Sequence, residues 1–171
     1  MLSTAISLDG PSSVRYPKGR GPGTVPDASL EGLPVGQAEV RRYGEGIALL
    51  AFGSMVAPAE TVGEALNATV VNMRFVRPLD EDCLQELAET HAQLITLEEN
   101  VVAGGAGSAV AEALARLNTQ RPILHIGLPD TYVQHGERDE QLEIVGLDTS
   151  GIHQRIATWL DHEVASALVS D

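Results

Sequence analysis

The sequence has few aromatic residues and almost no cysteine. Its 171 residues include one Trp, three Tyr and two Phe, so a core has to be built from Ala, Val, Leu and Ile. Cores of this kind are typical of parallel sheets covered by helices. The single Cys83 allows no internal disulfide and no multi-cysteine metal site, which fits a reducing compartment such as the cytoplasm and a buried structural thiol. The composition therefore favours a cytoplasmic α/β protein.

The sequence is also poor in basic residues, with 11 Lys and Arg against 24 Asp and Glu and a formal charge of −13. Because this charge repels a phosphate backbone, we expect no nucleic-acid partner. No apolar run approaches the roughly 18 residues that a membrane span requires, so we expect no membrane partner. The histidines show no metal-ligand spacing, and we expect no metal bound by this chain; they are His91, His125, His135, His153 and His162.

Composition divides the chain into three parts. Residues 1–18 begin with a short apolar stretch that resembles the end of a helix and lacks the basic start of a signal peptide. Residues 19–36 are rich in Pro and Gly, which indicates a linker. Residues 37–171 have the hydrophobic patterning of one compact domain. Because a domain rarely opens in the middle of a helix, we expect the chain to be part of something longer.

Strand and helix patterns alternate in the third part. Strands are predicted at 37–42, 47–52, 69–73, 94–97 and 123–126, and helices at 56–66, 78–90, 108–117 and 151–169. Gly53-Ser54 after the second of these strands indicates the N-cap of the helix that follows. Strands that alternate with single helices imply parallel neighbours joined by right-handed crossovers. The predicted fold is therefore a three-layer α/β/α sandwich with a mostly parallel five-stranded sheet.

Two segments lie where ligands bind open parallel sheets, just beyond the ends of strands. Residues 104–108 hold a glycine turn whose amides could bind an anion, but neither the dinucleotide nor the Walker pattern is satisfied. A tight turn that allows close helix-to-sheet contact, with Ser108 as a candidate cap, explains the glycines more simply. Glu98 and Glu99 could act as acid and base, yet neighbouring strand residues point to opposite faces. Their roles stay open, as does that of His135.

The most distinctive segment is Arg15-Tyr16-Pro17-Lys18-Gly19. Two cations lie three residues apart in a chain that is otherwise short of positive charge, and Pro17 restricts the backbone between them. This arrangement suits a small phosphorylated ligand. A basic loop leading into the linker is the alternative interpretation. No segment contains a recognisable catalytic nucleophile, because neither Ser54 nor Ser108 lies in a G-x-S-x-G pattern.

Several segments together resemble one family. The segments are residues 10–19, 66–80, 98–100 with 104–108, and 127–130, and they occur in the order and spacing of the 1-deoxy-D-xylulose-5-phosphate synthases. These are thiamine-diphosphate enzymes of the transketolase type. The resemblance covers nearly the whole chain, and it implies that residues 1–18 end a pyrimidine-binding domain and that 37–171 form a transketolase C-terminal domain.

The resemblance also implies a reaction and its partners. The complete homodimeric enzyme would condense pyruvate with glyceraldehyde 3-phosphate, release CO2 and supply isoprenoid, thiamine and pyridoxal synthesis. Thiamine diphosphate and Mg2+ would be held by upstream domains of the same enzyme, because their motifs are absent from this sequence. The isolated chain is therefore expected to bind no cofactor, to carry no catalytic residue and to be inactive, with a structural and dimerising role.

One functional position carries over from the family. The basic residue after Tyr-Pro is usually Arg there and contacts the phosphate of the acceptor substrate, and here it is Lys18. Lysine keeps the positive charge but cannot form the bidentate hydrogen bonds of a guanidinium group. Arg15 is expected to support this phosphate contact, while Tyr16 and Pro17 shape the loop.

Two other functions remain open. The chain could be the C-terminal domain of a 2-oxoacid dehydrogenase β subunit, which acts as an interaction module for an acyltransferase core. It could also be a free-standing regulator that binds an anion at the glycine turn of residues 104–107.

Overall fold

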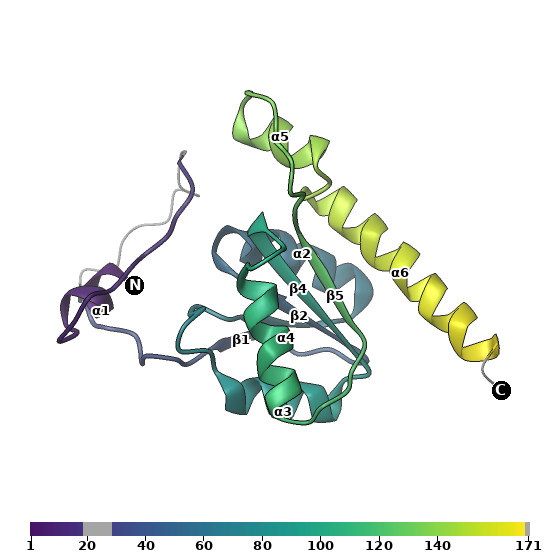
Figure 1. The fold of residues 1–171 in the computed structure, drawn as a ribbon, viewed down its shortest axis with the longest axis horizontal. Helices are drawn as coiled ribbons and strands as arrows, with labels where there is room; N and C mark the ends of the chain where they lie inside the picture. The colour runs from purple at the N-terminus through teal and green to yellow at the C-terminus, as the bar shows by residue number, and fades with distance from the viewer. Residues whose placement is uncertain (19–28, 170–171) are drawn as a thin grey trace.

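The computed structural model describes residues 1–18 and 29–169 and contains one five-stranded sheet (Figure 1). The strands are β1 (Glu39–Arg42), β2 (Ile47–Ala51), β3 (Thr69–Asn72), β4 (Gln93–Val101) and β5 (Ile123–Leu128). Their order is β1-β3-β2-β4-β5. Strands β3, β2, β4 and β5 run parallel to one another, whereas the edge strand β1 pairs antiparallel with β3. The predicted mostly parallel sheet is confirmed.

Helices cover both faces of the sheet. The helices of the described chain are α1 (Leu2–Ile6), α2 (Val56–Leu66), α3 (Glu81–Thr90), α4 (Ala106–Arg116), α5 (Arg138–Ile144) and α6 (Thr149–Val169), with a 3-10 turn η1 (Gly53–Met55) before α2, and all but α1 contribute to the layers. Helices α2 and α6 contribute to the core on one face, and α3 and α4 form the core on the other. Figure 1 shows α4 in front of the sheet and α2 behind it. These layers are the predicted α/β/α sandwich.

The central strand β2 explains why both faces need covering. Its residues 48–51 are fully buried, although consecutive side chains point to opposite sides of the sheet. Leu49 and Ala51 pack into the core formed with α2 and α6. Ala48 and Leu50 pack into the core formed with α3 and α4. A continuous apolar run is the sequence signature of such a doubly covered strand.

Some element bounds differ from the sequence prediction. Helix α3 begins at Glu81 and not at Pro78, because the Asp80 carboxylate accepts a hydrogen bond from the Cys83 amide (3.0 Å) and acts as the N-cap. The same carboxylate accepts from the Ala38 amide (2.7 Å), which ties the start of the domain to this helix. Helix α5 was not predicted, since only Leu142 of its seven residues is buried and the apolar pattern is too weak.

The N-terminal segment forms a small structure of its own. The apolar start of the chain is helical, as expected, and α1 stands to one side of the sheet in Figure 1. The buried hydroxyl of Thr4 accepts a hydrogen bond from the Leu33 amide (2.7 Å). Most of the predicted linker, residues 19–36, lies outside the described residues, so the three-part division remains a prediction. Within residues 1–18 and 29–169, no helix is long and apolar enough to cross a membrane.

Cys83 lies on α3, where it is partly buried against the core beneath that helix. Burial, followed by the nearby charges of Asp80 and Glu86, raises the pKa of the thiol to about 11. Because the thiolate is the reactive form, we predict that alkylation by iodoacetamide is slow at pH 8 and accelerates about tenfold per pH unit up to pH 10. Mass spectrometry of the modified chain measures these rates.

The unfolded chain in guanidinium chloride is the control for this measurement. Its thiol should titrate near the ordinary value of about 8.5, so its alkylation rate should level off above pH 9. A folded-state rate that also levels off near pH 9 would contradict the raised pKa.

Candidate functional site

Polar side chains gather near the carboxyl end of β4. The carboxyl ends of the parallel strands lie together at this edge of the sheet, which we call the carboxyl edge. Glu98 and Glu99 are adjacent there, and their carboxylates have no partner in common. Glu98 bonds to the start of α4, whereas Glu99 bonds to η1 and α5. Because α4 and α5 contribute to cores on different faces of the sheet, the two carboxylates lie on different sides, as strand alternation predicts. They therefore belong to two separate arrangements.

The Glu98 carboxylate closes the amino end of α4. The side chain is buried, with 3% of the residue exposed, and its two oxygens accept from the amides of Ala106 (2.7 Å) and Gly107 (2.8 Å). A carboxylate at a helix N-terminus also interacts favourably with the helix dipole. Since these two amides already bind an internal anion, they are not available to an external one. This removes the physical basis for an anion-binding regulator at the glycine turn.

The glycines of the turn provide room for Glu98. A Cβ on Gly105 would lie 2.3 Å from Glu98 Oε2 and 2.5 Å from the carbonyl oxygen of Val101. A Cβ on Gly107 would lie 2.6 Å from the Thr96 hydroxyl. The favoured interpretation of close helix-to-sheet contact is confirmed. Ser108 is not the cap: it lies inside α4, where its hydroxyl accepts from the Gly104 amide (3.0 Å) and donates to the Val102 carbonyl (3.0 Å).

The Glu99 carboxylate forms an ion pair with Arg138, the first residue of α5. Arg138 Nε donates to Oε1 (3.0 Å) and Nη2 donates to Oε2, which also accepts from the Ser54 hydroxyl. Burial would raise the pKa of Glu99, but the hydrogen bonds from Arg138 and Ser54, with the charges of Arg138 and Arg15, lower it below its usual value. The sequence had indicated Ser54 as a helix cap, and that was wrong: α2 begins at Val56 without a side-chain cap.

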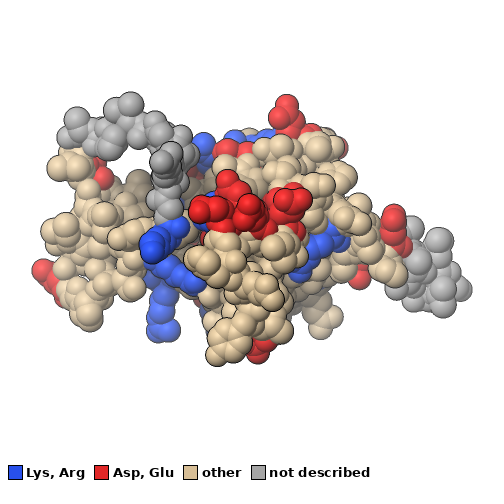
Figure 2. All heavy atoms as spheres, turned by 90° about the horizontal axis from the view of Figure 1, so that it is seen from above, with Lys and Arg blue, Asp and Glu red and all other residues tan. Residues whose placement is uncertain are grey.

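The structure brings Arg15 to the same place and leaves Lys18 in solvent. Arg15 Nη2 donates to the main-chain carbonyl of Glu99 (3.5 Å), across 84 residues of sequence. Lys18 is exposed and is the last residue described before the gap at 19–28. Tyr16 and Pro17 between them are exposed too. Figure 2 looks at the molecule from the α5 side and shows basic atoms directly beside a patch of acidic atoms.

Sequence reasoning missed Arg138, because nothing in the sequence connects it to a glutamate 39 residues earlier. The available signal was a lone arginine between acidic residues in an acidic chain. His135, whose role the sequence left open, is exposed on the loop before α5. His125 lies 2.7 Å from the Thr96 hydroxyl, and burial lowers its pKa while the charge of Glu98 opposes this shift. We assign these histidines no chemistry.

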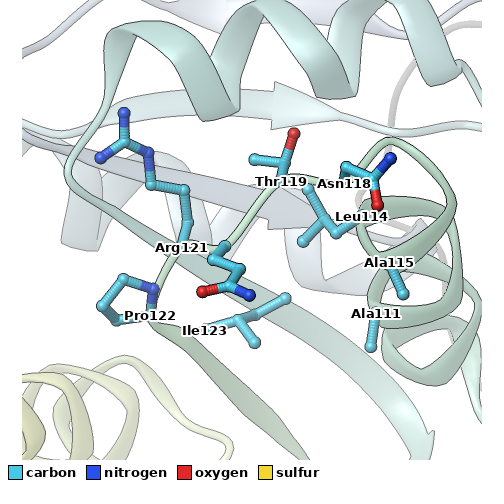
Figure 3. Close-up of a pocket in the computed structure, with 9 residues that line it drawn as sticks. Ala111, Leu114, Ala115, Asn118, Thr119, Arg121, Pro122 and Ile123 are labelled. Atoms are coloured by element: carbon cyan, nitrogen blue, oxygen red, sulfur yellow. The ribbon is translucent and has the colours of Figure 1, made fainter.

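One hollow lies away from these residues, beside the carboxyl end of α4 (Figure 3). Its volume is about 610 Å³, and its lining includes Leu114, Asn118, Arg121 and Ile123. The Arg121 guanidinium is turned to the Ala88 carbonyl, to which Nε donates (2.6 Å). A second hollow of about 380 Å³ lies between β5 and α6, beside Leu124 and Trp159. Neither hollow includes the residues of the carboxyl edge.

Comparisons with known proteins agree with one family. Residues 36–152 match the family described as Transketolase, C-terminal domain. Two similar proteins are 1-deoxy-D-xylulose-5-phosphate synthases: that of Thioalkalivibrio sulfidiphilus is 59% identical over 89% of this chain and 24% of its own length. That of Ectopseudomonas mendocina is 56% identical over 94% of this chain and 26% of its own length. The chain thus spans about a quarter of the length of these relatives.

Solved structures give the same fold. A chain described as a split-gene transketolase, inactive β4 tetramer, superimposes with a TM-score of 0.67 and 28% identity, covering 75% of this chain and 42% of that one. Transketolase from Campylobacter jejuni superimposes with a TM-score of 0.50 and 18% identity, covering 72% of this chain and 18% of its own, which shows the fold alone.

The contact between Glu98 and α4 predicts a stability effect. In Glu98→Gln the side chain keeps its size but replaces one acceptor oxygen with an NH2 group that faces a backbone N–H. We expect the free energy of unfolding in urea to fall by about 1–3 kcal/mol, because a hydrogen-bonded buried charge is lost. Circular dichroism at increasing urea concentration measures this change.

Glu64→Gln is the matched control, since Glu64 is exposed on α2. It should change the unfolding free energy by less than about 0.5 kcal/mol. Equal stabilities of the two variants would show that Glu98 does not hold the end of α4.

Proposed function

The chain belongs to the transketolase C-terminal domain family, and from this premise we propose that it works as the carboxy-terminal part of a 1-deoxy-D-xylulose-5-phosphate synthase. The observation that carries the proposal is the extent of the similarity: identities of 54–59% to synthases of several bacteria extend over 89–94% of the chain. The matches over 94% of the chain leave out at most ten residues and therefore include the Arg-Tyr-Pro-Lys segment at 15–18 as well as the folded domain.

The complete enzyme would join pyruvate and glyceraldehyde 3-phosphate with loss of CO2. Thiamine diphosphate would supply the carbanion chemistry, and Mg2+ would assist its binding. The described residues do not fit either group: residues 1–18 and 29–169 hold no cluster of three or more His, Cys, Asp or Glu able to bind a metal ion, and the amino end of α4 is filled by Glu98. Both cofactors are therefore assigned to the part of the enzyme outside this chain.

This chain would contribute substrate recognition. Arg15 lies at the carboxyl edge of the sheet, where open α/β sheets bind ligands, and it is held there by the Glu99 carbonyl. Lys18, three residues further and exposed, can extend toward an anion outside this chain. Together the two cations would bind the phosphate of glyceraldehyde 3-phosphate and hold that substrate for attack on its aldehyde carbon. Pyruvate, which has no phosphate, would not need them.

The folded domain would otherwise act as a structural unit. We infer that it packs against the upstream domains of the same polypeptide and takes part in a homodimer, as part of a cytoplasmic enzyme with water-soluble substrates. Since the part that binds the cofactors would be missing, the isolated chain would not catalyse the reaction.

We predict that the purified 171-residue chain forms no 1-deoxyxylulose 5-phosphate. The assay supplies thiamine diphosphate, Mg2+, pyruvate and glyceraldehyde 3-phosphate and measures product by mass spectrometry. The full-length enzyme that contains the chain is the positive control. Turnover by the isolated chain would overturn the assignment of the cofactors to upstream domains.

We also predict that Lys18→Ala in the full-length enzyme raises the KM for glyceraldehyde 3-phosphate about 10- to 100-fold. This range corresponds to the loss of a hydrogen bond between charged groups. The KM for pyruvate should change less than twofold. Steady-state kinetics with each substrate varied in turn separates the two constants.

Lys18→Arg is the control, because it keeps the positive charge and presents two parallel N–H donors that can bind the phosphate in a bidentate way. Its KM for the phosphorylated substrate should stay within about threefold of the wild-type value or fall. Equal losses for both substrates in Lys18→Ala would count against a phosphate contact.

A further inference from the structure

We propose that Arg138 is a positioning residue that neutralises Glu99 and so keeps Arg15 available for the phosphate of the acceptor substrate. This inference rests on the proposed function and adds to it a residue from the far end of the domain. It is based on three charged residues that contact one another at the carboxyl edge. Arg138 at the start of α5 and Arg15 on the N-terminal segment both bond to Glu99, which lies near the end of β4.

Arg138 and Ser54 together supply hydrogen-bond donors to both oxygens of the Glu99 carboxylate. Two nitrogens of Arg138, Nε and Nη2, each donate to a different carboxylate oxygen. This bidentate geometry gives the strongest pairs between guanidinium and carboxylate groups. The Ser54 hydroxyl adds a third donor to Oε2. The pair is partly shielded from water, with 33% of the Arg138 side chain and 20% of the Glu99 side chain exposed. Shielding strengthens the attraction relative to a pair on the open surface.

Arg15 makes a single, long hydrogen bond within the described part of the chain. Among the described residues, its guanidinium donates only to the main-chain carbonyl of Glu99, and this bond is long at 3.5 Å. No carboxylate of the described residues lies within ion-pair distance of it. Within the described part of the chain, Arg15 is thus located by a hydrogen bond to a neutral group, it has no direct ion pair, and its remaining N–H donors have no partner there. A cation in this state can bind an external anion without first giving up an internal one.

Removing the Arg138 side chain would leave the Glu99 carboxylate without its ion-pair partner. The Glu99 carboxylate already attracts Arg15, whose guanidinium is bonded to the main-chain carbonyl of the same residue. Without Arg138 this carboxylate would attract the Arg15 guanidinium more strongly. Acidic and basic atoms already lie side by side on this face in Figure 2, and the whole chain carries 13 excess negative charges. An internal ion pair between Arg15 and Glu99 would compete with the substrate phosphate.

Kinetics of the full-length enzyme test the proposal. Arg138→Gln removes the charge but keeps a hydrogen-bonding side chain of similar length. We expect the KM for glyceraldehyde 3-phosphate to rise about 5- to 20-fold, the size of a typical coupling between neighbouring charges. The KM for pyruvate should stay within about twofold. Inorganic phosphate, tested as a competitor of the acceptor, should inhibit this variant more weakly than the wild type by a similar factor.

The decisive variant is the double substitution Arg138→Gln with Glu99→Gln, because it removes the competing carboxylate as well. If neutralisation is what Arg138 provides, the acceptor KM of the double variant returns to within about twofold of the wild-type value. If Arg138 only fastens α5, the double variant is impaired at least as strongly as the single one, and the proposal is overturned. Glu99→Gln alone should leave the acceptor KM unchanged or lower it.

Arg15→Gln and Lys18→Ala separate this proposal from the proposed function. If both raise the acceptor KM while Arg138→Gln has no effect, the phosphate site stands and only the role of Arg138 is lost. If neither changes the acceptor KM, or the full-length enzyme forms no product, the phosphate site fails and the role of Arg138 fails with it.

Discussion

The burial of the Glu98 carboxylate at the start of α4 is the constraint on which the rest of the carboxyl edge depends. An ionised carboxylate inside a domain is strongly destabilising unless hydrogen bonds compensate its lost hydration. The amides of Ala106 and Gly107 provide this compensation, and they do so only because Gly105 and Gly107 have no Cβ to occupy the space. One contact thereby determines where β4 ends, where α4 begins and why glycine stands at two positions of the turn.

The position of Glu98 in turn determines what Glu99 can do. Since successive strand residues face opposite ways, a Glu98 directed at α4 places Glu99 on the side of Ser54 and Arg138. The carboxyl edge is therefore divided. On one side the Glu98 carboxylate occupies the amides of α4, and on the other the Glu99–Arg138 ion pair lies next to Arg15, which has no ion-pair partner among the described residues. A ligand with negative charge has a physical reason to approach only the second side, which is the side that Arg15 contacts.

The sequence predicted the layers well and the polar edge poorly, for identifiable reasons. Strand β2 could be predicted because a continuous apolar run that ends in Gly53-Ser54 is typical of a strand covered on both faces, and the structure buries four consecutive residues of this run. Helix α5 and its Arg138 could not, because the helix buries a single leucine and its partner, Glu99, is distant in sequence. Serine just before a helix usually indicates an N-cap, and by this rule Ser54 and Ser108 are predicted to be caps. In the structure their hydroxyls bond to Glu99 and Val102, and a residue's type does not reveal such distant partners.

The charge of the chain shows why local pairing matters more than net charge for binding an anion. A formal charge of −13 argues against a phosphate ligand if it is treated as spread over the whole surface. At physiological ionic strength, however, exposed charges more than about 8–10 Å apart are largely screened from each other. A phosphate at the carboxyl edge is then influenced mainly by the groups it contacts and their nearest neighbours. With Glu98 bonded to amides and Glu99 to Arg138, the nearest carboxylates are already compensated, and Arg15 remains positive within an acidic protein.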